Sequence, residues 1–300
     1  MRVMVTGATG FLGRRLCSKL LEDGHALIGL NQTGRSGVNQ NPISITYVPY
    51  KMGEALPKVV IDFSPQVIVH LAWDGIPDFS EEKCLENVEA QLRFFKETEC
   101  LSDLKKFLVT GTCREYGAKQ GACLEGECFS PDSYFSWAKQ TLRDYLTLSC
   151  QKRAVNMLWF RLFYVYGPGQ RAGSLIPTLI KAFKTNTDPI ISDPSASNDF
   201  IYIDDVISAF VKAIENEDCR GTFNLGSGYI SSVAEITKLV EYAVLSSDRF
   251  SSQLGKKSSE IKKNPSMWAD INLSSHYLGW KPKIGLAEGI TRTCQLDNYE

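Results

Sequence analysis

A glycine-rich turn directly behind the first apolar segment is the feature that most limits how this chain can fold. Residues 2–6 (RVMVT) lead into Gly7, Gly10 and Gly13, and a helical pattern of leucines follows. Gly7 permits a tight turn from strand to helix, Gly10 lets backbone amides approach a diphosphate, and Gly13 lets the helix pack closely on the strand. Because the first amides of a helix attract negative charge, the turn predicts a phosphate-binding site at the start of a doubly wound α/β fold.

The rest of the chain alternates short apolar runs with amphipathic stretches, which favours the same fold class. Continuous Val, Ile and Leu runs separated by helices are typical of parallel strands covered on both faces. Because such crossovers are right-handed, the expected product is a doubly wound, Rossmann-type parallel sheet. The pattern predicts strands at 2–6, 26–30, 45–48, 66–71, 106–110, 154–160, 200–203 and 222–225, and helices at 11–22, 80–100 and 231–245.

The rhythm of the sequence changes after about residue 165. Proline and glycine at 167–169 and the two prolines of 188–198 indicate loops that leave the sheet, and the lysine-rich segment 246–266 is expected to be irregular. We predict a dinucleotide-binding domain over residues 1–165, with returning segments near 199–228 and 268–275. Residues 166–300 are expected to form mainly a smaller, interleaved α/β domain that binds the substrate.

Composition and charge disfavour several classes of function. Lys and Arg number 33 against 34 Asp and Glu, with no long run of either sign, so a nucleic-acid-binding surface is not expected. No stretch of about 18 apolar residues would span a membrane. The nine cysteines show no C-x-x-C pair and only three histidines accompany them. We therefore expect reduced thiols in a soluble, cytoplasmic protein, without a disulfide framework or a metal site.

Further motifs follow the glycine turn in order along nearly the whole chain. They are His70-Leu71-Ala72, Asn87, Thr112-x-x-x-Tyr116-Gly117, 161–170 (RLFYVYGPGQ), 199–206 (DFIYIDDV), 223–228 (FNLGSG) and 278–282 (LGWKP). Together with the turn, this set resembles the extended short-chain dehydrogenase/reductases, the group of nucleotide-sugar epimerases, dehydratases and reductases. The resemblance implies a nicotinamide dinucleotide, a nucleoside diphosphate sugar as substrate, and a homodimer formed through two helices, here 84–100 and 134–150.

By the same resemblance, three side chains carry the chemistry: a Ser or Thr, a Tyr and a Lys, the last two as Tyr-x-x-x-Lys on a helix. Thr112 matches the hydroxyl that positions the substrate oxygen, and Lys139 matches the lysine that holds the nicotinamide ribose and lowers the pKa of the phenol. The position four residues before Lys139 is Phe135, which cannot donate a proton. Tyr134 is five residues from Lys139, and on a helix it is predicted to point away from the lysine's face. Pro131, four residues before Phe135, supports this register.

Two explanations of Phe135 remain open. The preferred one is that a tyrosine natural to this position has been replaced by phenylalanine in this chain, as is done to trap a bound substrate. The other is a natural member of the family that has lost its acid or has moved it to Tyr134, Cys113 or Tyr164.

The residues behind Thr112 bear on which reaction is carried out. The 4,6-dehydratases of the family have Asp-Glu at that point, whereas this chain has Cys113-Arg114, and Glu115 is expected on the wrong side of an extended segment. Dehydration is therefore not expected. The preferred function is NADP(H)-dependent reduction of the C4 ketone of a nucleotide-linked 4-keto-6-deoxyhexose. The alternatives are an NAD-dependent nucleotide-sugar 4-epimerase and a non-catalytic NADP(H)-binding sensor or scaffold, which Phe135 favours and the retained Thr112 opposes.

The preference for NADP(H) over NAD(H) depends on the end of the second strand. An NAD site usually has Asp or Glu there, whereas this chain has the neutral Asn31, with Arg35 just downstream. A carboxylate would repel a 2′-phosphate, and Arg35 could form charge-assisted hydrogen bonds with it. The predicted cofactor contacts are Gly7, Thr9, Gly10, Phe11, Leu12, Gly13, Asn31, Arg35, Leu71, Ala72, Trp73, Thr110, Lys139, Phe163 and Val165.

The diphosphate of the substrate is expected to need cations from the smaller domain. The family often has Arg where Asn198 stands and Asn where Tyr164 stands, so both familiar contacts are altered here. Arg171, Lys262 and Lys263 are the candidate replacements, and CDP, dTDP, GDP and UDP remain open as the nucleotide. The predicted substrate contacts are Thr112, Cys113, Arg114, Tyr134, Phe135, Tyr164, Arg171, Leu175, Asn198, Lys262 and Lys263.

Overall fold

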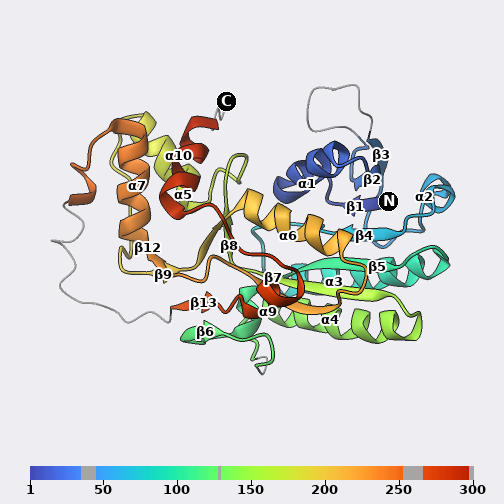
Figure 1. The fold of residues 1–300 in the computed structure, drawn as a ribbon. Coiled ribbons are helices and arrows are strands. Elements are labelled where there is room, and N and C mark those ends of the chain that lie inside the picture. Colours follow the sequence, from blue (N-terminus) through green and yellow to red (C-terminus); the bar gives the residue numbers. More distant parts are fainter. Residues whose placement is uncertain (35–44, 128–129, 253–265, 297–300) are drawn as a thin grey trace.

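A seven-stranded parallel sheet forms the centre of the computed structural model, which describes residues 1–34, 45–127, 130–252 and 266–296 (Figure 1). The strand order is β3-β2-β1-β4-β5-β7-β11, and β1 pairs with β2 on one side and with β4 on the other. Winding therefore reverses at β1, which confirms the doubly wound, Rossmann-type fold. The strands are β1 (Arg2–Thr6), β2 (Ala26–Asn31), β3 (Thr46–Pro49), β4 (Val67–His70), β5 (Lys106–Thr112), β7 (Asn156–Leu162) and β11 (Gly221–Leu225).

Helices cover both faces of this sheet, as the continuous apolar strands require. On one face α1 (Phe11–Glu22) packs against α6 (Ile203–Glu215), and on the other α3 (Glu81–Glu97) packs against α4 (Tyr134–Lys152), with the short α2 (Lys58–Phe63) near the edge (Figure 1). Successive residues of β1 serve the two faces in turn. Val3 and Val5 belong to the core under α1 and α6, whereas Met4 belongs to the core under α3 and α4.

Outside the central sheet, helices and short strand pairs bring distant segments of the chain together. Helices α5 (Leu175–Lys184), α7 (Val233–Leu245) and α10 (Leu286–Leu296) pack on one another at one end of the molecule (Figure 1). The strand pairs are β8 (Tyr164–Tyr166) with β10 (Phe200–Tyr202), β9 (Ser197–Asn198) with β12 (Ser231–Ser232), and β6 (Gly121–Cys123) with β13 (Met267–Ala269). The chain returns to the main sheet in between, because α6 and β11 belong there, and α9 (Asn272–Tyr277) contacts β11.

Buried aspartates tie the returning segments to the sheet. The carboxylate of Asp199, which is fully buried, accepts hydrogen bonds from the backbone amides of Ser227, Gly228 and Ala269. Asp205 accepts from the backbone amides of Lys283 and Ile284, at 2.9 and 3.0 Å. These carboxylates therefore hold segments that are distant in the sequence together, and their burial with satisfied hydrogen bonds is what a structural role requires.

Most sequence-predicted elements lie within two residues of the observed ones, and the differences are local. The predicted helix 80–100 ends as an α-helix at Glu97 and finishes in a 3₁₀ turn, Thr98–Cys100. The segment behind Thr112 was expected to be extended, but it is a 3₁₀ helix, Cys113–Tyr116, that begins with a capping box between Thr112 and Glu115. A side chain that satisfies the turn's first amides explains this correction.

No helix in the described ranges is long and apolar enough to cross a membrane. No group of three His, Cys, Asp or Glu side chains in those ranges could hold a metal ion. Six of the described cysteines are buried thiols, namely Cys17, Cys84, Cys113, Cys123, Cys150 and Cys219.

Candidate functional site

The glycine turn between β1 and α1 has the geometry of an anion cradle. Gly7 has a φ of +67°, and its amide donates to the carbonyl oxygen of Leu30 at 3.0 Å. A Cβ on Gly13 would lie 2.1 Å from the carbonyl oxygen of Gly7, so no side chain fits there. Gly10 is the N-cap of α1, and as a glycine it has no side chain that could cap the first turn. The amides that open α1 therefore face a space that suits a negatively charged group.

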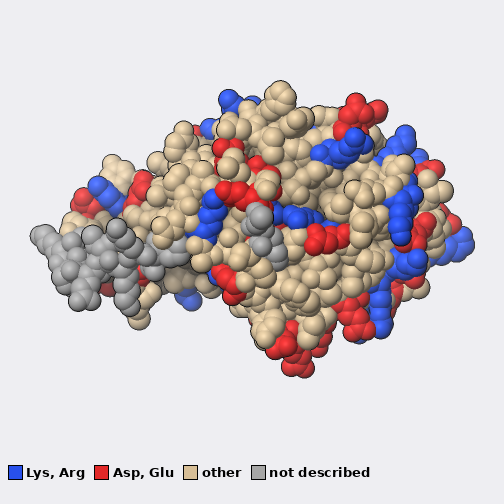
Figure 2. Space-filling view, turned by 90° about the horizontal axis from the view of Figure 1, so that it is seen from below, with Lys and Arg blue, Asp and Glu red and all other residues tan. Residues whose placement is uncertain are grey.

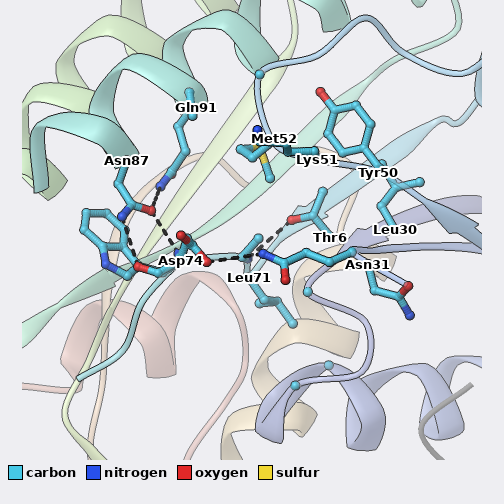
Figure 3. Close-up of a pocket in the computed structure, with 18 of the residues that line it drawn as sticks. Thr6, Leu30, Asn31, Tyr50, Lys51, Met52, Leu71, Asp74, Asn87 and Gln91 are labelled. Atoms are coloured by element: carbon cyan, nitrogen blue, oxygen red, sulfur yellow. Dashed lines mark hydrogen bonds between the residues drawn. The ribbon is translucent and has the colours of Figure 1, made fainter. Parts of the chain in front are cut away.

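A groove of about 1200 Å³ runs from this cradle along the carboxyl ends of the strands (Figure 3). It includes the predicted cofactor contacts at the turn (Gly7, Thr9, Gly10, Phe11, Leu12 and Gly13), at the end of β2 (Asn31) and behind β4 (Leu71, Ala72 and Trp73). Arg35 lies outside the described residues. Thr110, Lys139, Phe163 and Val165 do not line this groove, although Thr110 and Lys139 are bonded to each other.

The groove wall behind β3 and along α3 is absent from the predicted contacts, although Asn87 was among the motifs. Tyr50, Lys51 and Met52 follow β3, and Asn87 and Gln91 project from α3 into the same space (Figure 3). Their position could have been inferred, because β3 neighbours β2 and parallel strands end at one edge of the sheet. The α3 residues lie one turn apart on a single helix face, which the helical pattern alone also predicts.

A chain of buried hydrogen bonds fixes the end of β4 beside the turn. The hydroxyl of Thr6 lies 2.8 Å from Nδ1 of His70, and Nε2 of His70 lies 2.9 Å from the side-chain oxygen of Gln91. Burial lowers the pKa of His70 to about 3, so the ring is neutral at physiological pH. His70 therefore links β1, β4 and α3 through hydrogen bonds, and its neutral ring adds no charge to the groove.

The side chain of Asn31 accepts hydrogen bonds from its own turn at the end of β2. Its side-chain oxygen accepts from the backbone amides of Thr33 and Gly34, at 3.2 and 2.5 Å. Gln32 in turn donates to Asp74 at 3.2 Å across the groove. The neutral side chain at this position thus holds a turn that closes the groove's rim.

A second cavity of about 410 Å³ lies at the carboxyl end of β5. Its lining brings together the predicted residues Thr112, Cys113, Arg114, Phe135, Phe163 and Tyr164, with Phe79, Ser133 and Leu162 in addition. Arg114 forms an ion pair with Asp132 at 3.1 Å at the cavity's margin. Phe79, in the loop before α3, belongs to no motif, and no sequence signal would have found it.

Phe135 and Lys139 lie on one face of α4, in the register predicted. The helix begins at Tyr134 with Ser133 as its N-cap. The ammonium of Lys139 donates to the carbonyl oxygen of Thr110 at 2.9 Å, lies 4.5 Å from the centre of the Trp73 ring, and is 4% exposed. Burial lowers the pKa of Lys139 to about 8.

Tyr134 does not reach this region. Its side chain is half exposed and lines neither cavity, and a hydrogen bond with Glu81 raises the pKa of its phenol. Five residues along a helix turn Tyr134 away from the face of Lys139, as the sequence register predicts.

Glu115 is committed to a buried framework below the second cavity. Its carboxylate accepts from Nε of Arg161 at 2.8 Å, from Nε1 of Trp159 at 2.9 Å, and from the amide of Thr112. Both Glu115 and Arg161 are at most 1% exposed. A carboxylate that is fully used in this way is a structural group, and it also fixes Thr112 at the cavity.

The described contacts predicted within residues 166–300 do not line either cavity. Asn198 is in β9, Arg171 is exposed in the loop before α5, and Leu175 is the first residue of α5, and none of them lines either cavity. Lys262 and Lys263 lie outside the described residues. A surface view shows acidic and basic side chains mixed over the described face, without one large field of either sign (Figure 2).

Comparison with known proteins adds the following likenesses. A family model described as the NAD dependent epimerase/dehydratase family matches residues 3–226. UDP-glucose 4-epimerase of Mycolicibacterium smegmatis is 27% identical, over 98% of this chain and 98% of that protein. dTDP-4-dehydro-6-deoxyglucose reductase of Escherichia coli is 24% identical, over 97% and 95%. The structure of UDP-glucuronic acid 4-epimerase from Bacillus cereus in complex with NAD is similar in fold, with a TM-score of 0.81 and 24% identity over 99% of this chain and 96% of that one.

Proposed function

The chain belongs to the NAD-dependent epimerase/dehydratase family, and from this premise we propose that it is a nucleotide-sugar 4-epimerase that works with NAD(H). The observation that carries the proposal is the glycine cradle, which opens onto a groove lined by Trp73, and the ring of Trp73 lies 4.5 Å from the ammonium of Lys139. The epimerases among its relatives support this reaction over the C4-ketone reduction favoured by the sequence. The substrate on this proposal is a nucleoside diphosphate sugar.

The residues at the turn fit a dinucleotide. A Cβ at Gly13 or at Gly7 would press on backbone atoms 2.1 and 3.1 Å away, so small size at both positions keeps the cradle open. The backbone of residues 9–13 would hold the diphosphate and Asn31 the adenosine ribose, and the place of the nicotinamide half would lie at Leu71, Ala72, Trp73 and Lys139. When bound, the nicotinamide supplies the position that accepts and returns a hydride.

The chain's own polar groups near the reacting carbon are Thr112 and Lys139. The Thr112 hydroxyl would hold the oxygen on C4 of the sugar, and the charge of Lys139 would favour the ionised form of a neighbouring proton carrier. In 4-epimerisation that oxygen loses its proton when C4 becomes a ketone and regains one when the ketone is reduced. Phe135 has no proton to exchange, so we propose that the chain binds its ligands but turns over far below the rate of a tyrosine enzyme.

A second candidate is the NADP(H)-dependent reductase, which the neutral Asn31 favours. A carboxylate at the end of β2 would repel a 2′-phosphate, and the chain has none at this position. The likeness to the Escherichia coli reductase supports the same candidate. The sensor or scaffold remains the third, and its support is Phe135.

Turnover by a Phe135→Tyr variant tests these candidates together. With UDP-glucose, we expect UDP-galactose to form without net change in the absorbance of NADH, and Tyr134→Phe in the same background to have no effect. With a dTDP-4-keto-6-deoxyhexose, consumption of one NADPH per product would instead identify the reductase. No turnover of either substrate by the folded variant would contradict both enzymatic proposals and favour the sensor.

We also propose a homodimer formed through α3 and α4. These helices pack together and leave apolar side chains outside, with Leu85 48% and Leu148 62% exposed. Covering such side chains in a second copy is favourable. Light scattering of the chain and of a Leu85→Lys, Leu148→Lys variant measures this, and an unchanged mass would contradict it.

A further inference from the structure

Three aromatic rings separate the groove from the second cavity. The Trp73 and Phe135 rings meet edge to face with centres 4.9 Å apart, and the Phe79 ring lies 4.5 Å from Phe135. Trp73 lines the groove, whereas Phe79 and Phe135 line the second cavity, and the two linings share no described residue. The cluster of Trp73, Phe79 and Phe135 is called the aromatic partition here.

The partition covers Lys139. The lysine ammonium lies 4.5 Å from the centre of the Trp73 ring and 5.8 Å from that of Phe135, and its bonded partner is the Thr110 carbonyl. Lys139 is 4% exposed and contributes to neither cavity lining. A ligand in the groove therefore meets the Trp73 ring in the place where it would otherwise meet the ammonium.

Packing contacts hold the Trp73 ring, whereas its indole nitrogen makes no hydrogen bond within the described residues. Its indole N–H is buried, and no described residue accepts a hydrogen bond from it. The residues that follow it are held, since the Asp74 amide donates to Asn87 at 2.9 Å and Asp74 pairs with Lys83 at 2.8 Å. The backbone at the partition is thus fixed, while the ring is kept in place by packing and by the cation of Lys139.

We propose that Trp73 determines which part of a dinucleotide contributes affinity in this groove. The free protein binds the ADP-ribose part. The nicotinamide adds little affinity, because it must first displace the Trp73 ring from Lys139. The inference depends on the proposed function only in placing the dinucleotide in this groove. Affinity is reduced when part of a ligand must first open its own site, and removing the obstacle restores it. The ligand class for the closed groove is therefore an adenine nucleotide that carries a diphosphate.

Calorimetry with ADP-ribose and NADH as the two probes tests this on the whole chain. For the unmodified protein we expect the two Kd values to agree within about threefold. For Trp73→Ala we expect NADH to gain at least about tenfold over ADP-ribose, which is about 1.4 kcal/mol. Trp73→Phe keeps a smaller ring over Lys139, so its gain for NADH over ADP-ribose should be smaller than that of Trp73→Ala. The matched control is Trp137→Ala, at a half-buried tryptophan of α4 that lines neither cavity, and it should behave as the unmodified chain.

Three results would overturn the inference. They are a Kd for NADH more than about tenfold below that for ADP-ribose in the unmodified chain, an unchanged ratio in folded Trp73→Ala, or no binding of ADP-ribose at millimolar concentration. The first and third need no variant, so a failure of Trp73→Ala to fold does not protect the proposal. ADP-ribose binding without turnover by Phe135→Tyr would contradict the proposed function and leave this inference standing.

Discussion

The two ends of the groove differ in how accessible they are to a ligand. At the glycine cradle, small residues and uncapped amides leave an open space for a charged group. At the aromatic partition, the only described cation of the predicted catalytic set, Lys139, is buried under two rings, and the position of its partner is Phe135. The difference indicates that binding and proton exchange can be lost separately, because they depend on different ends of one site.

The largest effect on stability is expected at Glu115, in the buried framework below the aromatic partition. This framework must be intact if Phe135 is the only defect of the site. Glu115→Gln leaves the charge of Arg161 buried without its carboxylate, and removing one partner of a buried pair costs about 3–5 kcal/mol. Urea unfolding measures this. Glu127→Gln, at the more exposed pair with Lys119, serves as the control and should cost less than about 1 kcal/mol. A loss at Glu115 no larger than the control would contradict the buried framework.

A pH-dependent effect is expected at Lys139. Burial lowers its folded pKa to about 8, below the ordinary value of 10.5, so between these values the unfolded chain binds more protons and stability rises with pH. Lys139→Met should remove this rise, which amounts to at most about 3 kcal/mol. The difference in unfolding free energy between the two proteins, followed from pH 7 to 11, measures it. A difference that stays constant over this pH range would show that burial does not lower the pKa of Lys139.

A smaller loss is expected at the cradle. Gly13→Ala forces a Cβ against the Gly7 carbonyl, and overpacking of this kind costs about 1–3 kcal/mol. The variant should also weaken ADP-ribose binding, because the turn must shift. Gly126→Ala is the matched control, since a Cβ there meets nothing within 4 Å. Equal stability and equal ADP-ribose affinity for the two variants would contradict the role of the glycine cradle in binding.

The smallest effect is expected at the margin of the second cavity. Arg114→Ala breaks a largely exposed pair with Asp132, and such pairs contribute less than about 1 kcal/mol. Thermal unfolding should therefore change little, while the KM for the nucleotide sugar in the Phe135→Tyr background reports whether Arg114 contacts the substrate. A large loss of stability would show that Arg114 belongs to the framework and not to the margin.

The sequence was most informative where one local pattern determines the structure. The turn from Thr6 to Gly13, the doubly wound class of the sheet and the register of Phe135 with Lys139 all follow from short-range patterns. The partition could not be predicted in this way, because Trp73, Phe79 and Phe135 come from separate loops and a helix. The 3₁₀ turn behind Thr112 was missed because its capping box depends on Glu115, whose orientation is set by the distant Arg161.

The most direct test compares the unmodified chain with Phe135→Tyr in two measurements on the same preparations: the Kd for NADH and the rate of C4 epimerisation. The account predicts that the Kd changes by less than about threefold, while the rate rises by about 10²–10⁴-fold, the usual contribution of a positioned proton carrier. A rate that stays at background in the folded variant, or a rise that is matched by an equal gain in NADH affinity, would contradict it.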